Sequence, residues 1–131
     1  MISFETFTIR DGSPIYLQMI EFIERGIASG TIADGEELPS RRVLSATLGV
    51  NPGTVQKAYR ALEEAGVIES RSGAKSCITC SESLKQKLRT AFIAKDIEMM
   101  VQNLKQTGIT CEEALSLIEA TWKDPALNHP K

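Results

Sequence analysis

Apolar residues in the first half of the chain recur every three or four positions, which is the spacing of one buried face of an α-helix. Three helices are predicted. The first has Ser13 as its N-cap and Pro14 at its first position, and it ends at Gly30, which tolerates the left-handed conformation of a helix C-terminus. Its core-facing residues are Tyr16, Ile20, Ile23 and Ile27, and an apolar arm ahead of it contains Ile2, Phe4, Phe7 and Ile9.

A tight turn separates the second and third predicted helices. Ser40 is a good N-cap for the second and Gly49 suits its C-terminus, while Asn51 caps the third and Pro52 takes the first helical position. Gly66 ends the third helix. The inward faces are expected to contain Val43, Leu44, Thr47 and Leu48 in the second helix and Val55, Ala58, Tyr59 and Leu62 in the third.

A short β-hairpin is predicted directly after the third helix. Val67-Ile68 and Cys77-Ile78 are expected to form two strands joined across residues 71–75. Two helices joined by a glycine-containing turn form the helix-turn-helix pattern, whose second helix aims its N-terminal residues at base edges in DNA. The hairpin is then a wing that reaches a neighbouring groove or phosphates. An ordinary pair of helices with solvated polar residues would give the same helical pattern.

Residues 13–78 resemble the DNA-binding domain of the GntR family of bacterial transcription regulators. The matching residues are Pro14-Ile15-Tyr16, Ser29-Gly30, Asp34-Gly35, Leu38-Pro39-Ser40 with Arg42, Leu48-Gly49-Val50, Thr54-Val55 with Ala58-Tyr59, and Leu62-Glu63 with Gly66-Val67-Ile68. The resemblance implies a winged helix-turn-helix that binds DNA. Because only a short helical region follows, the chain is similar to the YtrA-like subgroup, whose members dimerise through that region and repress operons that include ABC-transporter genes.

The chain departs from the family pattern at the wing and on the third helix. The family usually has two glycines at the hairpin, whereas here Gly73 fills the first position and Lys75 the second. Pro52 and Gln56 stand where many members have an arginine that contacts guanine. Gln56 is therefore expected to pair with adenine instead.

The residues predicted to contact DNA lie on the second and third helices and on the wing. Arg42 is the strongest candidate because it matches the family's DNA-contacting arginine after Pro39-Ser40. Gly53 allows close approach of the backbone to DNA. The predicted set is Ser40, Arg41, Arg42, Asn51, Gly53, Thr54, Gln56, Lys57, Arg60, Arg71, Gly73 and Lys75.

The charge distribution supports this location although the net charge of −2 does not. Residues 1–37 contain two basic and seven acidic side chains, whereas residues 38–80 contain six basic and three acidic ones. The resulting charge of +3 coincides with the predicted helix-turn-helix and wing. The excess is modest, so weak non-specific affinity is expected for one subunit.

Two further helices are predicted after a linker at residues 79–83, where Ser81 or Ser83 caps the first. That helix has two apolar stripes on nearly opposite faces: Leu84, Leu88, Ala91 and Phe92 form one, and Ile93, Ile97, Met100 and Leu104 form the other. Either a kink near Ala94 separates the halves, or the first half packs on its own domain and the second on a partner subunit. The second interpretation is favoured here.

The last helix is predicted to follow Gly108 and to begin with a capping box of Thr110 and Glu113. Its inner face is predicted to contain Cys111, Ala114, Leu115, Ile118, Thr121 and Trp122, and the tail after Asp124-Pro125 is expected to be mobile. The predicted dimer interface is Ile93, Ile97, Met100, Leu104, Leu115, Ile118 and Trp122. Two such helices do not enclose an ordinary effector pocket, and no pattern identifies a particular small-molecule effector.

Other reactive residues favour no second function. Cys77 and Cys80 have the C-x-x-C spacing of zinc or redox sites, but on a strand they point to opposite faces, and only Cys111 and His129 remain to complete four ligands. No catalytic site, metal site or cofactor is predicted. A signal peptide and an apolar run of membrane-spanning length are both missing from the sequence, which predicts a cytoplasmic protein without a membrane partner.

The sequence therefore predicts a mainly α protein with a small β-hairpin. Residues 1–80 form a winged helix-turn-helix DNA-binding domain and residues 81–131 a short helical dimerisation domain. The predicted function is that of a homodimeric repressor that binds an inverted-repeat operator in double-stranded DNA. The alternative is a winged-helix protein-interaction module, which would expose an apolar patch on the third helix instead of Thr54, Gln56, Lys57 and Arg60.

Overall fold

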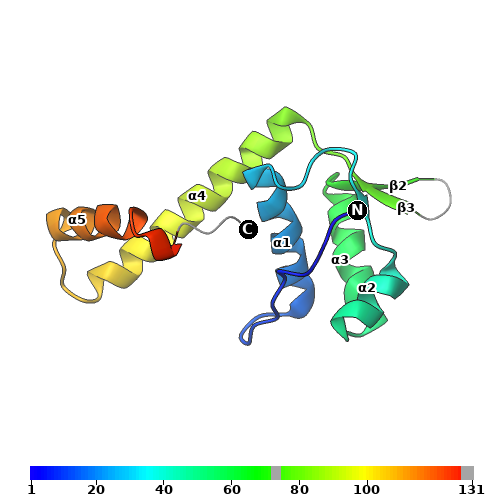
Figure 1. The fold of residues 1–131 in the computed structure, drawn as a ribbon, viewed down its shortest axis with the longest axis horizontal. Coiled ribbons are helices and arrows are strands. Elements are labelled where there is room, and N and C mark those ends of the chain that lie inside the picture. The colour runs from blue at the N-terminus through cyan, green and yellow to red at the C-terminus, as the bar shows by residue number, and fades with distance from the viewer. Residues whose placement is uncertain (72–74, 128–131) are drawn as a thin grey trace. The chain divides into compact units, whose positions relative to one another are not determined.

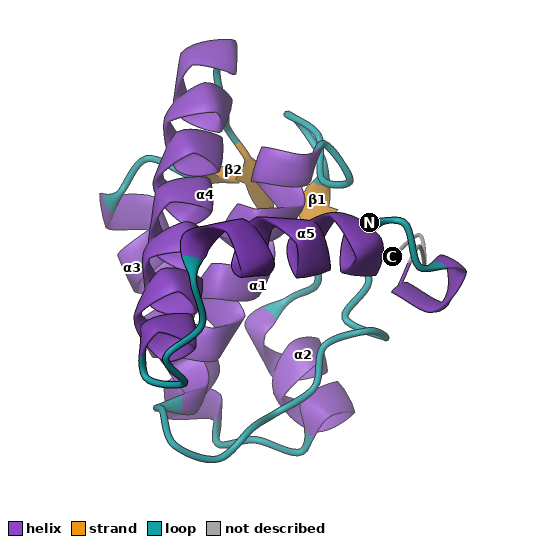
Figure 2. Ribbon diagram, turned by 90° about the vertical axis from the view of Figure 1, so that its left-hand side faces the viewer, coloured by secondary structure: helices purple, strands orange, loops and turns teal. Residues whose placement is uncertain are grey.

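The structure is a computed structural model that describes residues 1–71 and 75–127, and its described part is mainly helical, as predicted (Figures 1 and 2). The elements are α1 (Ile15–Ser29), β1 (Glu37–Leu38), α2 (Arg41–Leu48), α3 (Pro52–Glu64), β2 (Ile68–Arg71), β3 (Lys75–Ile78), α4 (Glu82–Lys105), α5 (Cys111–Trp122) and the 3-10 helix η1 (Pro125–Leu127). The chain divides into two compact units, residues 1–90 and 91–131. Within the described ranges, no helix is both long enough and apolar enough to span a bilayer.

The hydrophobic core of the first unit forms around α3, which packs against α1, α2 and β2 (Figure 1). The inward face of α3 is the one predicted from its periodicity, since its four apolar members are each at most 1% exposed; they are Val55, Ala58, Tyr59 and Leu62. The N-terminal arm adds Ile2 and Phe4 to the same buried cluster. The arm therefore packs on the domain as predicted, with Ile9 at its end remaining exposed.

The start of α1 differs from the prediction. Ser13 does not cap the helix; Pro14 occupies the N-cap position, and its carbonyl accepts from the N–H groups of the first turn. The side chain of Gln18 instead anchors the segment that precedes α1. Its Nε2 donates to the carbonyls of Arg10 (2.8 Å) and Ser13 (3.0 Å), and its Oε1 accepts from the N–H of Arg10 (2.8 Å). These bonds satisfy a polar side chain that is buried on the apolar face of α1.

The caps of α2 and α3 are those predicted. Ser40 Oγ accepts from the N–H of Val43 (3.2 Å), and Asn51 Oδ1 accepts from the N–H of Gly53 (2.7 Å). Gly49 has a φ of +67° and closes α2 in the left-handed conformation. These local signals make the tight turn between the two helices.

The prediction for the inner face of α2 is partly wrong. Leu44 and Ser45 are buried and Leu48 is half-buried, but Val43 is 51% exposed and Thr47 is exposed. Ser45 faces inward because its hydroxyl donates to the carbonyl of Val50 (2.7 Å) across the turn. A buried hydroxyl with a partner costs little, and this one ties α2 to the start of α3.

The sheet has three antiparallel strands in the order β1-β3-β2, one more than the predicted hairpin. Ile68 pairs with Ile78 and Arg71 with Lys75 in the hairpin, while Glu37 of β1 pairs with Cys77. The N–H of Ile2 donates to the carbonyl of Glu37 (2.9 Å), so the arm continues this edge of the sheet. The predicted wing tip at Gly73 lies outside the described residues.

The helix α4 continues without a break in its helical assignment from Glu82 to Lys105. Ser81 is its cap, since its Oγ accepts from the N–H of Leu84 (3.1 Å). Leu84 and Leu88 pack against the core of the first unit, as predicted. The capping box of Thr110 and Glu113 at the start of α5 is also confirmed.

The Gly26→Ala variant is expected to lower the free energy of unfolding by about 1–3 kcal/mol, because overpacking a close contact is destabilising. A Cβ on Gly26 would lie 2.4 Å from Cδ1 and 2.7 Å from Cγ1 of Ile32, which is buried and whose N–H donates to the Gly26 carbonyl (3.0 Å). Chemical denaturation measures this change.

The Ile32→Ala background supplies the control, because it removes the two atoms that the new methyl group would meet. There, Gly26→Ala should be neutral or stabilising, as alanine is favoured over glycine inside a helix. The same loss of stability in both backgrounds would contradict the close-contact explanation.

Candidate nucleic-acid interface

The buried residues on the inner face of α3 determine which of its residues form the outer face. With Val55, Ala58 and Tyr59 directed into the core, Lys57 and Arg60 lie on the opposite side of the helix and are exposed. The remaining candidates on this helix, Thr54 and Gln56, are half-buried. The residues at the N-terminus of α3, Asn51 and Gly53, are exposed. This helix therefore presents polar and cationic side chains to solvent.

Arg41 and Arg42 are neighbours in sequence, but their surroundings differ. Arg42 is exposed, and its guanidinium makes no ion pair with the part of the chain that the structure describes. The Arg41 Nη2 lies 3.0 Å from Glu63 Oε1 of α3, and its guanidinium carbon lies 5.1 Å from the centroid of the Tyr59 ring. Only Arg42 of this pair is therefore available to an incoming anion without breaking a contact.

Tyr59 connects α3 to the segment that leads into α2. Its hydroxyl donates to the carbonyl of Pro39 (2.6 Å), and the residue is 1% exposed. Burial raises the pKa of Tyr59 well above its ordinary value of 10, and the nearby Arg41 opposes this only in part. The phenol therefore stays a neutral hydrogen-bond donor and fixes the position of Ser40, the cap of α2.

The cations of the hairpin are held by carboxylates. Arg71 Nη2 lies 3.0 Å from Glu69 Oε1, and Lys75 Nζ lies 3.9 Å from Glu37 Oε2 of β1. Both cations remain more than half exposed, so these are surface pairs of small energy.

Of the six predicted cations, three are thus ion-paired, and Arg42, Lys57 and Arg60 have no carboxylate partner among residues 1–71 and 75–127. Lys57 also lies over the Tyr16 ring of α1, 4.2 Å from its centroid.

Comparisons with known proteins identify the family of this helix-turn-helix and hairpin. Residues 15–76 match the family model of bacterial regulatory proteins, gntR family. Over 105 residues, the chain is 35% identical to the HTH-type transcriptional repressor YtrA of Bacillus subtilis (strain 168), covering 80% of this chain and 76% of YtrA. The chain belongs to the gntR family.

Two further comparisons extend the likeness of this gntR-family chain beyond its helix-turn-helix. It is 30% identical over 110 residues to the HTH-type transcriptional regulator YhcF of Bacillus subtilis (strain 168), covering 84% of this chain and 91% of YhcF. A GntR family transcriptional regulator from Listeria monocytogenes matches with a TM-score of 0.75 and 29% identity, covering 86% of this chain and 98% of that one. The predicted winged helix-turn-helix fold is thereby confirmed, and the relatives are named as regulators of transcription rather than as enzymes.

Two cysteines of this gntR-family chain, Cys77 and Cys80, have surroundings that disfavour reactivity, whereas Cys111 is exposed. Cys77 is buried in β3, and Cys80 follows the strand with its N–H donating to Asp34 Oδ1 (2.8 Å). Burial raises the pKa of the Cys80 thiol, and the nearby carboxylates of Asp34 and Glu82 raise it further, against the opposing effect of Lys85. Among the residues the structure describes, no group of three histidine, cysteine or acidic side chains is placed to hold a metal, and His129 lies outside them.

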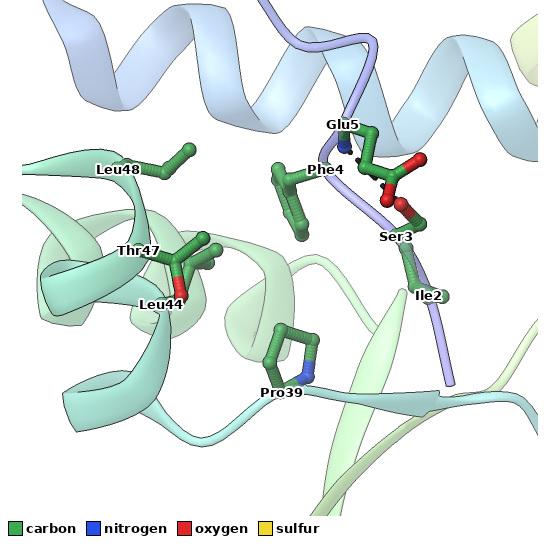
Figure 3. A pocket seen from close by; sticks show the side chains of 8 residues that line it. All are labelled: Ile2, Ser3, Phe4, Glu5, Pro39, Leu44, Thr47 and Leu48. Atoms are coloured by element: carbon green, nitrogen blue, oxygen red, sulfur yellow. Dashed lines mark hydrogen bonds between the residues drawn. The ribbon is translucent and has the colours of Figure 1, made fainter.

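The sequence did not indicate a hollow of about 390 Å³ between the N-terminal arm and α2 (Figure 3). Its lining residues are Ile2, Ser3, Phe4, Glu5, Pro39, Leu44, Thr47 and Leu48. Figure 3 shows the Phe4 side chain projecting between the arm and the side chains from α2. The arm thus lies beside α2.

Proposed function

We propose that this chain is a homodimeric transcription repressor that binds an inverted-repeat operator through α2, α3 and the hairpin. The observation that carries the proposal is that Arg42 of α2 and Lys57 and Arg60 of α3 are exposed cations without carboxylate partners in the described structure, on the helix-turn-helix of a gntR-family chain. Its dimer would place two such surfaces on one duplex. The resemblance to the YtrA-like subgroup extends the proposal to an operon that includes ABC-transporter genes, regulated in the cytoplasm.

Each element has a proposed part in binding. The start of α3, with Asn51, Gly53 and Thr54, would enter the major groove, where the Gln56 carboxamide pairs with adenine. Lys57, Arg60 and Arg42 would bind flanking phosphates or bases, and Ser40 would bind a phosphate beside them. The wing residues Arg71, Gly73 and Lys75 would contact a neighbouring groove. Arg41 is left out of this contact set because Glu63 already binds its guanidinium.

The proposed dimer interface is supported by the exposure of the second unit. No residue of α4 or α5 is buried, so these two helices have no core of their own. Ile93, Ile97, Leu115 and Trp122 are between 45% and 79% exposed. Together with Met100, Leu104 and Ile118 they would be covered by the same surface of a second copy. Apolar surface of this extent on two helices favours association.

The alternative role as a protein-interaction module requires an apolar patch on the helix-turn-helix. Among the described residues between 38 and 80, Val43 on α2 is the large apolar side chain that is exposed. A single such residue is ordinary for a protein surface. The polar and cationic outer face of α3 therefore favours DNA over a protein partner.

Selection of bound sequences from a random DNA pool at about 0.1 M salt tests the proposed function, because specific binding persists where phosphate contacts alone become weak. The expected result is an inverted repeat with an A·T pair at the position that Gln56 reads. Its occurrences in the source genome would identify the operon. A folded protein that enriches no sequence, alone or with cell extract, would contradict the proposal.

The salt dependence of operator binding is expected to reflect only the cations that have no carboxylate partner. Three cations per subunit without carboxylate partners give six in the dimer, which corresponds to a slope of about −5 in a plot of log K against log salt concentration. Titrations between low and moderate salt measure this slope. A slope near −11, which all twelve cations would give, would show that the three ion pairs open when DNA binds.

A further inference from the structure

Arg41 lies on the first turn of α2, but its side chain is directed at α3. Besides the ion pair with Glu63 and the contact with the Tyr59 ring, its Nε is fully enclosed and has no hydrogen-bond partner in the described structure. The side chain is 31% exposed. A guanidinium that served mainly to bind phosphate would keep its nitrogen donors open to solvent, as Arg42 does. Arg41 instead directs its Nη2 at Glu63, and its Nε is enclosed by the protein.

Glu63 extends this contact to the hairpin. Its Oε1 accepts from Arg41, while Ser70 Oγ of β2 donates to its Oε2 (3.4 Å). One carboxylate on the last turns of α3 thus joins the first turn of α2 to the first half of the wing. The Tyr59 hydroxyl adds a third link, because its acceptor Pro39 immediately precedes the cap of α2. The cluster of Arg41, Tyr59, Glu63 and Ser70 connects the three elements that the proposed function places on DNA.

We propose that Arg41 is a positioning residue, which with Glu63 holds α2 and the wing in a fixed orientation on α3, and not a DNA contact. This inference rests on the proposed function. Successive residues of a helix are turned by about 100° from each other, so fixing Arg41 against α3 directs Arg42 outward. Pre-organising the three elements spares the cost of ordering them when DNA binds.

The Glu63→Ala variant distinguishes the two roles of Arg41 by the sign of its effect. If Glu63 positions the elements through Arg41, its loss weakens operator binding by about fivefold, the size expected for coupling through a partly exposed ion pair. If Arg41 contacts DNA, the same change releases a cation and removes a negative charge, so binding becomes tighter. Operator affinity is measured by titration at constant salt concentration.

Glu64→Ala is the matched control, because it removes the same side chain from the next position of α3. Glu64 is exposed and forms no ion pair within the described structure. Its variant should bind as tightly as the wild type or slightly more tightly, since it also removes a negative charge. Glu63→Ala binding as tightly as Glu64→Ala would overturn the positioning role.

The swapped variant Arg41→Glu/Glu63→Arg tests the pair directly. It restores an ion pair in the opposite sense, with the acid near the start of α2 and the base near the end of α3, where the helix dipoles favour them. Affinity is expected to return to within about twofold of the wild type with the same salt slope, because no phosphate contact is changed. Affinity that stays as low as that of Glu63→Ala, with a salt slope reduced by the loss of Arg41, would overturn the proposal.

Failure of the proposed function gives a different result. A wild type that enriches no DNA sequence removes the DNA-binding role of every residue, including this one. The stability coupling between Arg41 and Glu63 in a double-mutant cycle would still be measurable in that case. A wild type that binds its operator while Glu63→Ala binds more tightly overturns only the positioning role.

Discussion

The Arg42→Ala variant is expected to bind operator DNA at least about 30-fold more weakly than the wild type, because an arginine contact to a base or phosphate contributes about 1–3 kcal/mol and the proposed dimer loses two of them. Arg42 is exposed on α2 and forms no ion pair among the described residues, so its guanidinium needs no rearrangement to meet DNA. The variant is expected to keep the fold and the proposed dimer, since Arg42 is an exposed side chain of α2. Gel-shift titrations at constant salt concentration measure the loss.

Arg89→Ala provides the comparison for this variant. Arg89 is also exposed, but it lies on α4 and outside the helix-turn-helix. The Arg89→Ala variant should bind operator with an affinity within about twofold of that of the wild type, as expected for a distant surface charge. Circular dichroism and sedimentation confirm that both variants are folded and dimeric. Unchanged affinity of Arg42→Ala, or an equal loss in both variants, would remove Arg42 from the interface.

The helix-turn-helix was predictable from the sequence because its signals are local. The periodicity of Val55, Ala58, Tyr59 and Leu62 fixes which side of α3 faces the core, and all four are buried. Ser40, Gly49 and Asn51 act at the helix ends where their side-chain and backbone preferences predict. Such features need only neighbouring residues, so one sequence suffices to find them.

Buried polar residues explain the errors in the helix faces. Gln18 and Ser45 look like surface positions in a pattern of apolar residues, yet both are buried. Gln18 is satisfied by backbone groups before α1, and Ser45 by the carbonyl of Val50. These hydrogen-bond partners depend on how the chain folds back on itself. The spacing of apolar residues gives no information about this. The same holds for β1, a two-residue strand that exists only because β3 lies beside it.

The composition of the candidate site was predictable, but the availability of its charges was not. The sequence identifies the six cations between residues 38 and 80, and counting their charge indicates where the candidate surface lies. Contacts between distant residues then pair Arg41 with Glu63 and Lys75 with Glu37. The structure therefore divides the cations into paired and unpaired groups, which determines the expected salt dependence and the role assigned to Arg41.

The Ile97→Glu variant is expected to be monomeric at micromolar concentration and to bind operator more than about 100-fold more weakly than the wild type. Ile97 is 51% exposed on α4, in a unit whose two helices bury no residue by themselves. In the proposed dimer its side chain is covered by apolar groups, and an unpaired carboxylate buried there costs several kcal/mol. The dimer avoids this cost by dissociating, and the two half-sites are then no longer bound as a linked pair.

Gln102→Glu separates the effect of the interface from that of an added charge. Gln102 is exposed on the side of α4 opposite the stripe of Ile93, Ile97, Met100 and Leu104, about 140° around the helix from Ile97, and receives the same new side chain. It should remain dimeric and bind operator as the wild type does. Sedimentation equilibrium measures the subunit mass, and circular dichroism shows that the helices persist. An Ile97→Glu protein that stays dimeric would place the interface elsewhere, whereas a monomer with full operator affinity would mean that one subunit suffices for recognition.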